Sequence, residues 1–412
     1  MTGDTRTVLA TCLCGAAAHD VPFPTTPSPA RFCHCGSCRH AIGTLALGMV
    51  EPVKGYRPSQ SLVDKLQPYA FSQRVTCYHC PTCGTAMLSR EERAGRDPNW
   101  MLSTGTLAAF DGVVEVDCHE YLTDTLDGGL SDFLTHVDGK PIDRWPGKPG
   151  EGERLPLHWQ SPTRPPPNPT PSPADKLRAH CKCNGVEFWL ARPSARSAMG
   201  QAPWPDVLRP SGNNDDDAAD DDDEDDAVSE PDDTAWWLRA AGTKFLASLC
   251  ACASCRFACG QEWMAWAYVP ASDLSLDAAG SVPFTREFGT LKQYRSSEDV
   301  TRHFCGTCGA TAFWDGDARP FLLDVAVGLL EAGEGARAEG WLEWRVTRLS
   351  HREEALGRAR RITEGVEEGL AAYGKRVPGE GVVDGQSATP CRASLRLRPP
   401  SDDSAPKPSK PE

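Results

Sequence analysis

The feature that most constrains this chain is a set of three cysteine motifs that occurs twice in the same order. Each set has a C-x-C pair, then a compact C-x-C-x-x-C motif, then a C-x-x-C-Gly pair. The first set comprises Cys12, Cys14, Cys33, Cys35, Cys38, Cys80 and Cys83. The second set comprises Cys181, Cys183, Cys250, Cys252, Cys255, Cys305 and Cys308. Because order and internal spacing agree throughout, we interpret the chain as two copies of one module.

The patterned cysteines are predicted to bind metal rather than to form disulfides. Two cysteines separated by one or two residues rarely bridge each other, but they suit one tetrahedral ion bound through thiolates. Residues 1–10 contain neither an apolar export segment nor an Arg-rich transit pattern. We therefore expect a reducing cytoplasmic setting, with the nucleus as the alternative, and there such pairs are more often metal ligands than crosslinks.

The cysteines of each copy divide into a group of four and a group of three. A structural zinc site is closed by four ligands, whereas a catalytic site keeps three protein ligands and an open position. The C-x-C and C-x-x-C-Gly pairs are far apart in sequence, so a four-cysteine site built from both would link the two ends of a module. The C-x-C-x-x-C motif would then supply three thiolates beside an open position. We expect about four zinc ions per chain, two in each copy.

Short apolar segments predict a mainly β fold. Residues 188–190, 264–269 and 321–327 are rich in aromatic and β-branched side chains and are bounded by Gly and Pro, which is typical of strands. The cysteine pairs would then lie on turns between strands. The glycines that accompany them are expected to adopt backbone conformations that other residues resist. These glycines are Gly84, Gly185 and Gly309.

One helix is predicted near the C-terminal end of the second copy. Apolar residues recur at three- and four-residue steps from Leu356 to Tyr373, which aligns them on one face. Ser350-x-x-Glu353 resembles a capping box before this segment, and Gly374 with Pro378 would end the helix.

We expect two zinc-binding modules, over 9–145 and 179–376, joined by a Pro-rich linker over 146–178. The second module carries an acidic insertion near 211–233. Such a run of like charges repels itself and cannot bury apolar area, so it predicts a disordered, solvated loop, with binding of a protein partner as the alternative. The tail over 377–412 is rich in Pro, Ser and Gly and is also predicted to be disordered.

Composition argues against two classes of function. The net charge of −14 disfavours non-specific binding to nucleic acid, which needs a cationic surface, although a local basic patch would override this. No stretch approaches the roughly 20 apolar residues of a membrane helix. Hydrophobic residues make up 40%, which is enough for folded cores. We therefore expect a globular protein that binds neither nucleic acid nor membranes.

The motif order C-x-C-G, C-H-C-x-x-C-R and C-x-x-C-G resembles the glutathione-dependent formaldehyde-activating enzyme and centromere protein V family. The segment over 291–305, which leads into the last cysteine pair, is also similar to the family pattern. The resemblance spans about Leu9 to Trp145 and His180 to Tyr373. It implies tandem β-rich tent folds, zinc, and carbon–sulfur chemistry between a thiol such as glutathione and a small aldehyde.

The same resemblance assigns the ligands. The structural zinc ligands would be Cys12, Cys14, Cys80 and Cys83, and then Cys181, Cys183, Cys305 and Cys308. The reactive-site ligands would be Cys33, Cys35 and Cys38, and then Cys250, Cys252 and Cys255. The better reactive site is expected in the first copy, where His34 lies between two of these cysteines and Ala251 replaces it in the second copy. His34 either donates a proton or only makes a local hydrogen bond.

The expected function is a lyase-type, reversible addition of the thiol to the aldehyde. The alternative is a non-catalytic zinc-binding scaffold or interaction protein, which the centromere-linked branch of the family would suggest. A nucleic-acid zinc finger fits poorly, because the charge is acidic and no finger-like histidine pair is present. Arg39 and Arg256, directly after the compact motifs, either steer an anionic thiol or are structural.

Several further cysteine, histidine and acidic residues lie outside these motifs in the sequence. Cys77 offers a rival pairing with Cys80, while Cys118 and Cys259 are expected to be small buried hydrophobes. A base near a reactive site would come from His119, Glu120 or Asp124, which are otherwise ordinary solvated or structural residues. The first copy also has His79 where the second has Phe304. Cys391 lies in the polar tail and receives no role.

Overall fold

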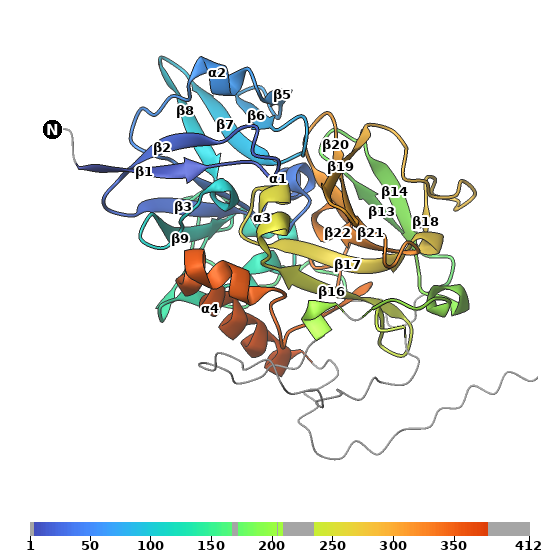
Figure 1. Cartoon of the computed structure of the whole chain (residues 1–412). Coiled ribbons are helices and arrows are strands. Elements are labelled where there is room, and N and C mark those ends of the chain that lie inside the picture. Colours follow the sequence, from blue (N-terminus) through green and yellow to red (C-terminus); the bar gives the residue numbers. More distant parts are fainter. Residues whose placement is uncertain (1–3, 167–171, 204, 209–234, 378–412) are drawn as a thin grey trace, which may run out of the picture. The chain divides into compact units, whose positions relative to one another are not determined.

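Two sheets carry the cysteine motifs, one sheet for each copy (Figure 1). The computed structural model describes residues 4–166, 172–203, 205–208 and 235–377. The strand order is β12-β9-β3-β4-β8-β7-β6-β5 in the first sheet and β15-β16-β17-β22-β21-β20-β19 in the second, where β23 also pairs with β16. The first sheet comprises β3 (Ser28–Cys33), β4 (Leu47–Val50), β5 (Gln67–Ala70), β6 (Val75–His79), β7 (Ala86–Arg93), β8 (Arg96–Ser103), β9 (Val114–Glu120) and β12 (Asp143–Arg144). The second comprises β15 (Leu238–Arg239), β16 (Lys244–Cys250), β17 (Met264–Pro270), β19 (Leu291–Ser297), β20 (Val300–Cys305), β21 (Thr311–Gly316), β22 (Leu322–Ala326) and β23 (Leu342–Trp344).

Smaller sheets bring the first cysteine pair of each copy into place. In the first copy, β1 (Thr5–Ala10) pairs with β2 (His19–Pro24). In the second copy, β13 (Lys176–His180) pairs with β14 (Glu187–Ala191), which also pairs with β18 (Leu274–Ser275). The short strands β10 (His136–Val137) and β11 (Lys140–Pro141) form a separate hairpin. The predicted mainly β class is confirmed. The predicted strands over 188–190 and 264–269 fall within β14 and β17, and the one over 321–327 contains β22 and extends one residue beyond it at each end.

The two copies share one topology. The order β3-β4-β8-β7-β6-β5 in the first copy matches β16-β17-β22-β21-β20-β19 in the second. In each copy a later strand returns parallel to the strand that carries the first cysteine of the compact motif: β9 runs beside β3, and β23 beside β16. The central strands β17 and β22 are buried at every position, as expected for short, continuous apolar runs.

Two short helices lie where the copies meet (Figure 1). Helix α1 (Gly36–Ile42) ends at Gly43, whose carbonyl accepts a hydrogen bond from the Gly328 amide at 2.9 Å. Helix α3 (Ala253–Cys259) ends at Gly260, whose carbonyl accepts from the Gly105 amide at 3.0 Å. Each helix therefore contacts the opposite copy through the same backbone bond. This reciprocal arrangement resembles the isologous interface of a symmetric dimer, and both copies belong to one unit, Met1–Gly379.

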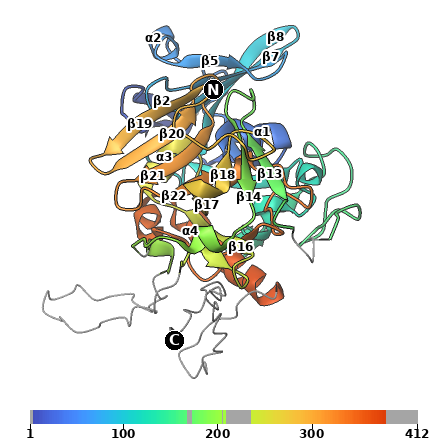
Figure 2. The same ribbon diagram turned by 90° about the vertical axis from the view of Figure 1, so that its right-hand side faces the viewer.

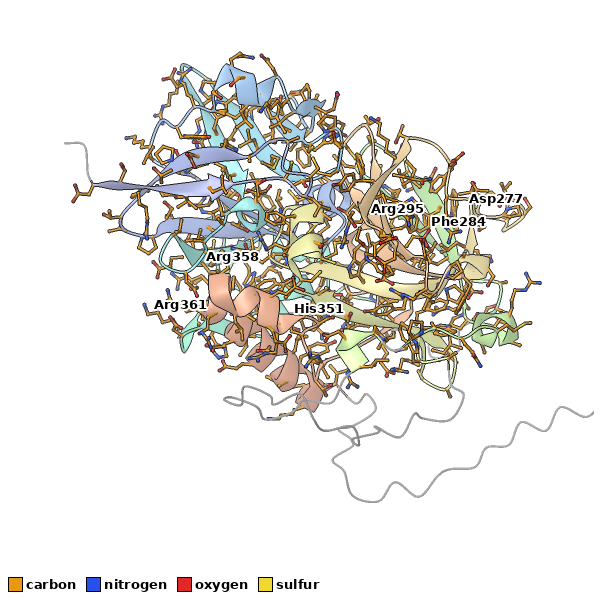
Figure 3. All side chains as sticks on the ribbon, viewed as in Figure 1. Asp277, Phe284, Arg295, His351, Arg358 and Arg361 are labelled. Atoms are coloured by element: carbon orange, nitrogen blue, oxygen red, sulfur yellow. The ribbon has the colours of Figure 1, made fainter. Side chains whose placement is uncertain are left out.

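The predicted C-terminal helix is confirmed as α4 (Arg352–Arg376), and it packs against the first copy. A Cβ atom on Gly369 would overlap the Phe133 carbonyl, so the helix backbone approaches that loop directly. Figure 3 shows Arg358 and Arg361 on this helix. Arg358 forms an ion pair with Glu262, and Arg361 with Asp138 of the first copy.

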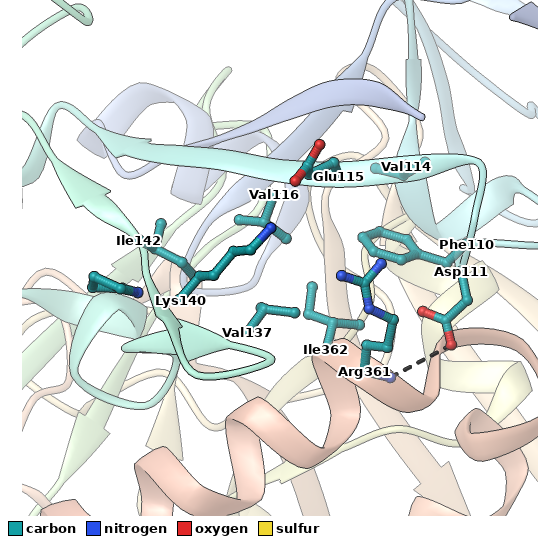
Figure 4. Close-up of a pocket in the computed structure, with 11 residues that line it drawn as sticks. Phe110, Asp111, Val114, Glu115, Val116, Val137, Lys140, Ile142, Arg361 and Ile362 are labelled. Atoms are coloured by element: carbon teal, nitrogen blue, oxygen red, sulfur yellow. Dashed lines mark hydrogen bonds between the residues drawn. The ribbon is translucent and has the colours of Figure 1, made fainter. Parts of the chain in front are cut away.

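A small cavity of about 120 Å³ lies between α4 and the first copy. Figure 4 shows Phe110, Val137 and Ile362 around it, with the Arg361 backbone amide donating to the Asp111 carboxylate at 3.4 Å. These contacts explain where the apolar face of α4 is buried.

Three local predictions were wrong. Gly374 lies inside α4, which continues to Arg376, while Pro378 lies outside the described residues. The Ser350 hydroxyl donates to the Asp206 carboxylate at 3.2 Å and does not cap α4, which instead follows His351 in a left-handed conformation (φ 54°). Gly84 and Gly309 take positive φ as predicted, but Gly185 does not, because the preceding Asn184 takes it instead (φ 57°). Asparagine tolerates this region better than most residues.

Some predicted segments lie outside the described residues. These are residues 167–171 of the expected linker, the acidic insertion over 211–233, and the tail from residue 378 onward. Among the helices in the described ranges, none combines the length and the apolar character needed to span a bilayer.

Candidate metal centres

The C-x-C and C-x-x-C-Gly pairs of the first copy meet in one cluster. Cys12 and Cys14 lie on the turn after β1, and Cys80 and Cys83 lie on the turn between β6 and β7. The Sγ atoms of Cys12 and Cys14 are 3.5 Å apart, and those of Cys14 and Cys80 are 3.6 Å apart. Four sulfurs bound to one tetrahedral zinc ion at about 2.3 Å would be about 3.8 Å apart. The observed spacing therefore fits a four-thiolate metal site.

The second copy repeats this cluster with Cys181, Cys183, Cys305 and Cys308. The Sγ atoms of Cys181 and Cys183 are 3.5 Å apart, and those of Cys183 and Cys305 are 3.4 Å apart. Within each of the two clusters all ligand atoms lie within 4.8 Å of one another. The grouping of cysteines expected for the closed sites is thus present in both copies.

The compact motifs form two further clusters of three. Cys33 ends β3, Cys35 precedes α1 and Cys38 lies in its first turn; their sulfur atoms lie within 4.8 Å of one another. The Cys35 sulfur accepts a hydrogen bond from the Cys38 amide at 3.3 Å. Helix formation therefore holds the two sulfurs on the same side of the loop.

Cys250, Cys252 and Cys255 form the matching cluster in the second copy. The Cys252 sulfur accepts from the Cys255 amide at 3.3 Å, as in the first copy. At the other side of each loop a carboxylate accepts from the first helical amide: Asp124 from Gly36 at 3.3 Å, and Glu354 from Ala253 at 2.8 Å. Asp124, one of the candidate bases, thus supports the loop of the first cluster.

Both three-cysteine clusters favour at least one thiolate. Hydrogen bonds from Cys33 and Cys38 lower the pKa of Cys35 to about 3. Hydrogen bonds from Cys250 and Cys252, with the charge of Arg302 nearby, hold the pKa of Cys255 well below its ordinary value. The thiolate is the form of cysteine that binds metal and reacts as a nucleophile.

His34 is fully buried and its ring hydrogen-bonds His119. The His119 Nε2 atom lies 2.8 Å from the Leu134 carbonyl, which only accepts, so this nitrogen carries the proton and Nδ1 is an acceptor. The His34 Nε2–H then donates to His119 Nδ1 at 2.9 Å. Burial lowers the pKa of both rings, so each is neutral and the single ring proton of His34 faces His119.

The arginines after the compact motifs are both buried. Arg256 donates to the backbone carbonyls of Gly105 and Leu107 in the opposite copy, which is a structural contact. Arg39 donates to the His34 carbonyl at 3.3 Å. Glu120 lies opposite Cys33 in the parallel pair of β9 and β3, and burial raises the pKa of its carboxyl group.

Each four-cysteine cluster has a tyrosine of the opposite copy nearby. Tyr294 on β19 has its pKa raised by burial and by the cysteines of the first cluster. Burial and the cysteines of the second cluster raise the pKa of Tyr69 on β5 to about 12. Figure 2 shows β5 near the β19–β20 hairpin. The two closed clusters therefore lie near the junction between the copies.

The remaining described cysteines are free thiols outside these clusters. Cys83, rather than Cys77, completes the first four-cysteine cluster, so the rival pairing is not the one formed. Cys118 and Cys259 are buried, as predicted. Cys391 lies outside the described residues.

A cavity of about 250 Å³ opens beside the second three-cysteine cluster. Trp266 donates from Nε1 to the Cys255 sulfur at 3.4 Å, and Arg302 donates from Nη1 to the same sulfur at 3.6 Å. The other walls include Tyr268, Trp314, Arg319 and Asp324. This wall was not predicted from the sequence.

The corresponding positions of the first copy carry different side chains. In the β19–β20 strand pair Arg302 lies opposite Tyr294, and in the corresponding β5–β6 pair Cys77 lies opposite Tyr69. Cys77 is therefore the counterpart of Arg302. In the β17–β22 strand pair Trp266 lies opposite Ala326, and in the corresponding β4–β8 pair Met49 lies opposite Ser103. Met49 is therefore the counterpart of Trp266. Aligning the two copies would have revealed these differences in the sequence.

Fold and clusters together define a tandem β protein with two kinds of cysteine site that could hold metal ions. A family model described as glutathione-dependent formaldehyde-activating enzyme matches residues 7–124 and 237–343, which together make up more than half of the chain. The chain belongs to this family, and each matched region contains one three-cysteine cluster. No curated protein and no solved structure matches the chain.

Proposed function

We propose that the chain is a zinc-dependent, carbon–sulfur lyase-like protein that handles adducts of a glutathione-like thiol and a small aldehyde. Family membership supports the chemistry, and the separate clusters of four and three cysteines support the two kinds of metal site. The observation that carries the proposal is the cavity beside Cys250, Cys252 and Cys255. A site with three protein ligands and adjacent space is what a working metal centre needs.

In this proposal each cluster holds one zinc ion. The four-cysteine clusters would be closed and structural, and the three-cysteine clusters would keep a position for a ligand. Bound zinc would supply a Lewis acid and a binding site for sulfur. Three thiolates leave such a centre negatively charged, and Arg302 beside Cys255 would balance part of that charge in the second copy.

The reaction would be reversible addition. The thiol sulfur forms a bond to the aldehyde carbon, the π electrons of the carbonyl bond move to its oxygen, and that oxygen takes up a proton as the thiol loses one. The aromatic side chains of Trp266 and Trp314 would exclude water from the reacting atoms in the second copy. Holding the two reactants together contributes to the rate by proximity alone.

Assignment of the better site to Cys33, Cys35 and Cys38, with His34 as proton donor, stays a prediction. General acid catalysis of this kind is typically worth about 10²–10⁴ in rate. For that role the His34 ring would have to leave its hydrogen bond to His119. The second copy has the cavity, so the two clusters must be compared directly.

The comparison measures formation of the thiol–aldehyde adduct by the zinc-loaded chain and by three variants. If the first copy is the working site, Cys35→Ser and His34→Ala lower the rate by about 10² or more, and Cys252→Ser leaves it unchanged. If only Cys252→Ser abolishes turnover, the assignment is reversed. If the parent protein accelerates no reaction across a panel of thiols and aldehydes, the lyase proposal fails.

The metal content gives a second test. We expect about four zinc ions per chain in a purified, reduced sample, and about three after Cys83→Ser or Cys35→Ser, because each change removes a ligand from one cluster. Cys77→Ser is the matched control, since Cys77 belongs to none of the four clusters. A parent protein with two zinc ions or fewer contradicts the division into four and three.

A non-catalytic zinc-binding scaffold is the second candidate function. The observation that favours it is the His34–His119 pair, since a fully buried, neutral ring that hydrogen-bonds locally has a structural role. In that case mutation of the three-cysteine clusters changes stability and metal content but reveals no turnover.

A further inference from the structure

The cavity beside the second three-cysteine cluster contains a buried ion pair that the lyase chemistry above does not use. Arg319 and Asp324 both line the cavity, with side chains only 8% and 9% exposed. Arg319 Nη2 lies 2.7 Å from Asp324 Oδ1. Burial raises the pKa of the Asp324 carboxyl to about 6, which reflects the cost of holding this charge away from water.

The pair still has hydrogen-bonding capacity. Arg319 Nη1 is buried and has no hydrogen-bond partner among the described residues. A carboxylate such as that of Asp324 can accept up to about four hydrogen bonds. A buried donor without a partner costs free energy, and such a group in a cavity marks a position where a polar ligand or water belongs.

The chemistry of the pair selects the ligand group. A group that satisfies both partners must accept from the guanidinium and donate to the carboxylate. A hydroxyl does both, a carbonyl oxygen only accepts, and an ammonium only donates. The guanidinium lies over the Trp314 ring at 4.4 Å, which holds it in a fixed orientation.

The sulfur atoms of Cys250, Cys252 and Cys255 form another wall of the same cavity. A thiol–aldehyde adduct carries its sulfur and its hydroxyl on one carbon, so it can present both groups to these two walls. We propose that this cavity binds the hydroxyl end of such an adduct and that Arg319 and Asp324 determine specificity for that hydroxyl. The proposal rests on the proposed function for its ligand class.

The first copy has no carboxylate at the position that corresponds to Asp324. Asp324 lies two residues before Ala326, and Met101 lies two residues before Ser103, so Met101 is the counterpart of Asp324. A methionine in place of the carboxylate cannot accept a strong hydrogen bond. Hydroxyl recognition is therefore a property of the second copy, whichever copy catalyses turnover.

The test measures binding and does not require turnover. The zinc-loaded full chain is titrated by calorimetry with S-(2-hydroxyethyl)glutathione and with S-ethylglutathione, two stable thioethers that differ only in the hydroxyl. Hydrogen bonds to charged groups predict about tenfold or tighter binding of the hydroxyl compound. In the double variant Arg319→Met/Asp324→Met the two ligands should bind with equal affinity.

Removing both charges together avoids an unpaired buried ion, so this variant should remain folded. The matched control is Arg358→Met/Glu262→Met, which removes another buried pair that does not line the cavity. The control should keep the tenfold preference. Equal affinities in the parent protein, no binding of either ligand, or a preference that survives in the double variant would each overturn the proposal.

This outcome is separate from that of the lyase proposal. Hydroxyl-selective binding without turnover supports the specificity site and rejects the enzyme. Turnover in a parent protein whose ligand preference does not depend on Arg319 and Asp324 supports the enzyme and rejects the specificity site.

Discussion

At the scale of single residues, the two copies agree where their backbones touch and differ where a ligand would bind. Gly43 and Gly260 end the two junction helices with φ of 85° and 71°. A Cβ atom on either glycine would overlap a backbone carbonyl of the opposite copy, that of Thr311 or Ala86. By contrast, Asp324 of the cavity has Met101 as its counterpart. The junction therefore demands glycine, whereas the cluster surroundings accept different side chains.

Replacing a junction glycine should destabilise the protein more than the strain of a left-handed backbone conformation alone would. Gly43→Ala combines a left-handed conformation with overlap on the Thr311 carbonyl, so we expect a loss of about 3 kcal/mol or more. The control is Gly242→Ala, where φ is 81° and nothing lies within 4 Å of the added Cβ. This control should lose only about 1–2 kcal/mol. Denaturant unfolding of both variants checks the difference, and equal losses would show that the junction tolerates displacement.

At the scale of elements, helix α4 belongs to one copy in sequence and to the other in packing. It follows directly after the second copy's sheet, yet Gly365 and Gly369 lie against the His136 and Phe133 carbonyls of the first copy. Its apolar face is thus buried by residues more than two hundred positions away. Most of the stability of such a helix comes from this tertiary packing rather than from intrinsic propensity.

Two glycines of α4 make this packing measurable. Gly369→Ala should destabilise the chain by about 1–3 kcal/mol, because the added methyl group overlaps the Phe133 carbonyl. Gly357→Ala on the same helix has nothing within 4 Å and should stabilise it by up to about 1 kcal/mol through helix propensity. Thermal unfolding of the two variants should shift in opposite directions. Shifts of the same sign would mean that α4 does not pack as described.

Repeated, local features were predictable from the sequence, and unrepeated, long-range features were not. The cysteine clusters could be predicted because identical spacing in two copies identifies one site twice. The existence of α4 follows from its apolar periodicity, but periodicity does not say which surface covers that face. The cavity wall was missed because Trp266, Arg302 and Asp324 come from three different strands and share no spacing. The orientation of the His34 ring depends on a hydrogen bond to His119, which is distant in sequence, so this orientation could not be predicted either.

At the scale of the whole molecule, the two copies share one core. A single cluster of buried apolar residues includes side chains of both copies, from Val8 to Tyr373. The junction helices, Arg256 and α4 all cross between the copies. We therefore expect the two copies to unfold together as one cooperative unit.

Calorimetry should accordingly show one unfolding transition for the zinc-loaded chain, with equal calorimetric and van't Hoff enthalpies. Loss of one closed cluster by Cys308→Ser should lower that single transition, because a structural zinc contributes roughly 10–16 kcal/mol of apparent binding free energy in small zinc domains. The copy with intact Cys12, Cys14, Cys80 and Cys83 should lose stability together with the other copy. Two separate transitions, with only one affected by the substitution, would show that the copies unfold independently.

The reciprocal junction also bears on how the two halves diverged. In a homodimer every substitution appears twice, so a charge introduced beside one reactive cluster is introduced beside both. Here both halves belong to the same chain, and Arg302 occupies in one half the position that Cys77 occupies in the other. Because both halves belong to one polypeptide, a substitution beside one reactive cluster leaves the other cluster unchanged. The two halves can therefore differ around their clusters while the reciprocal junction between them stays the same.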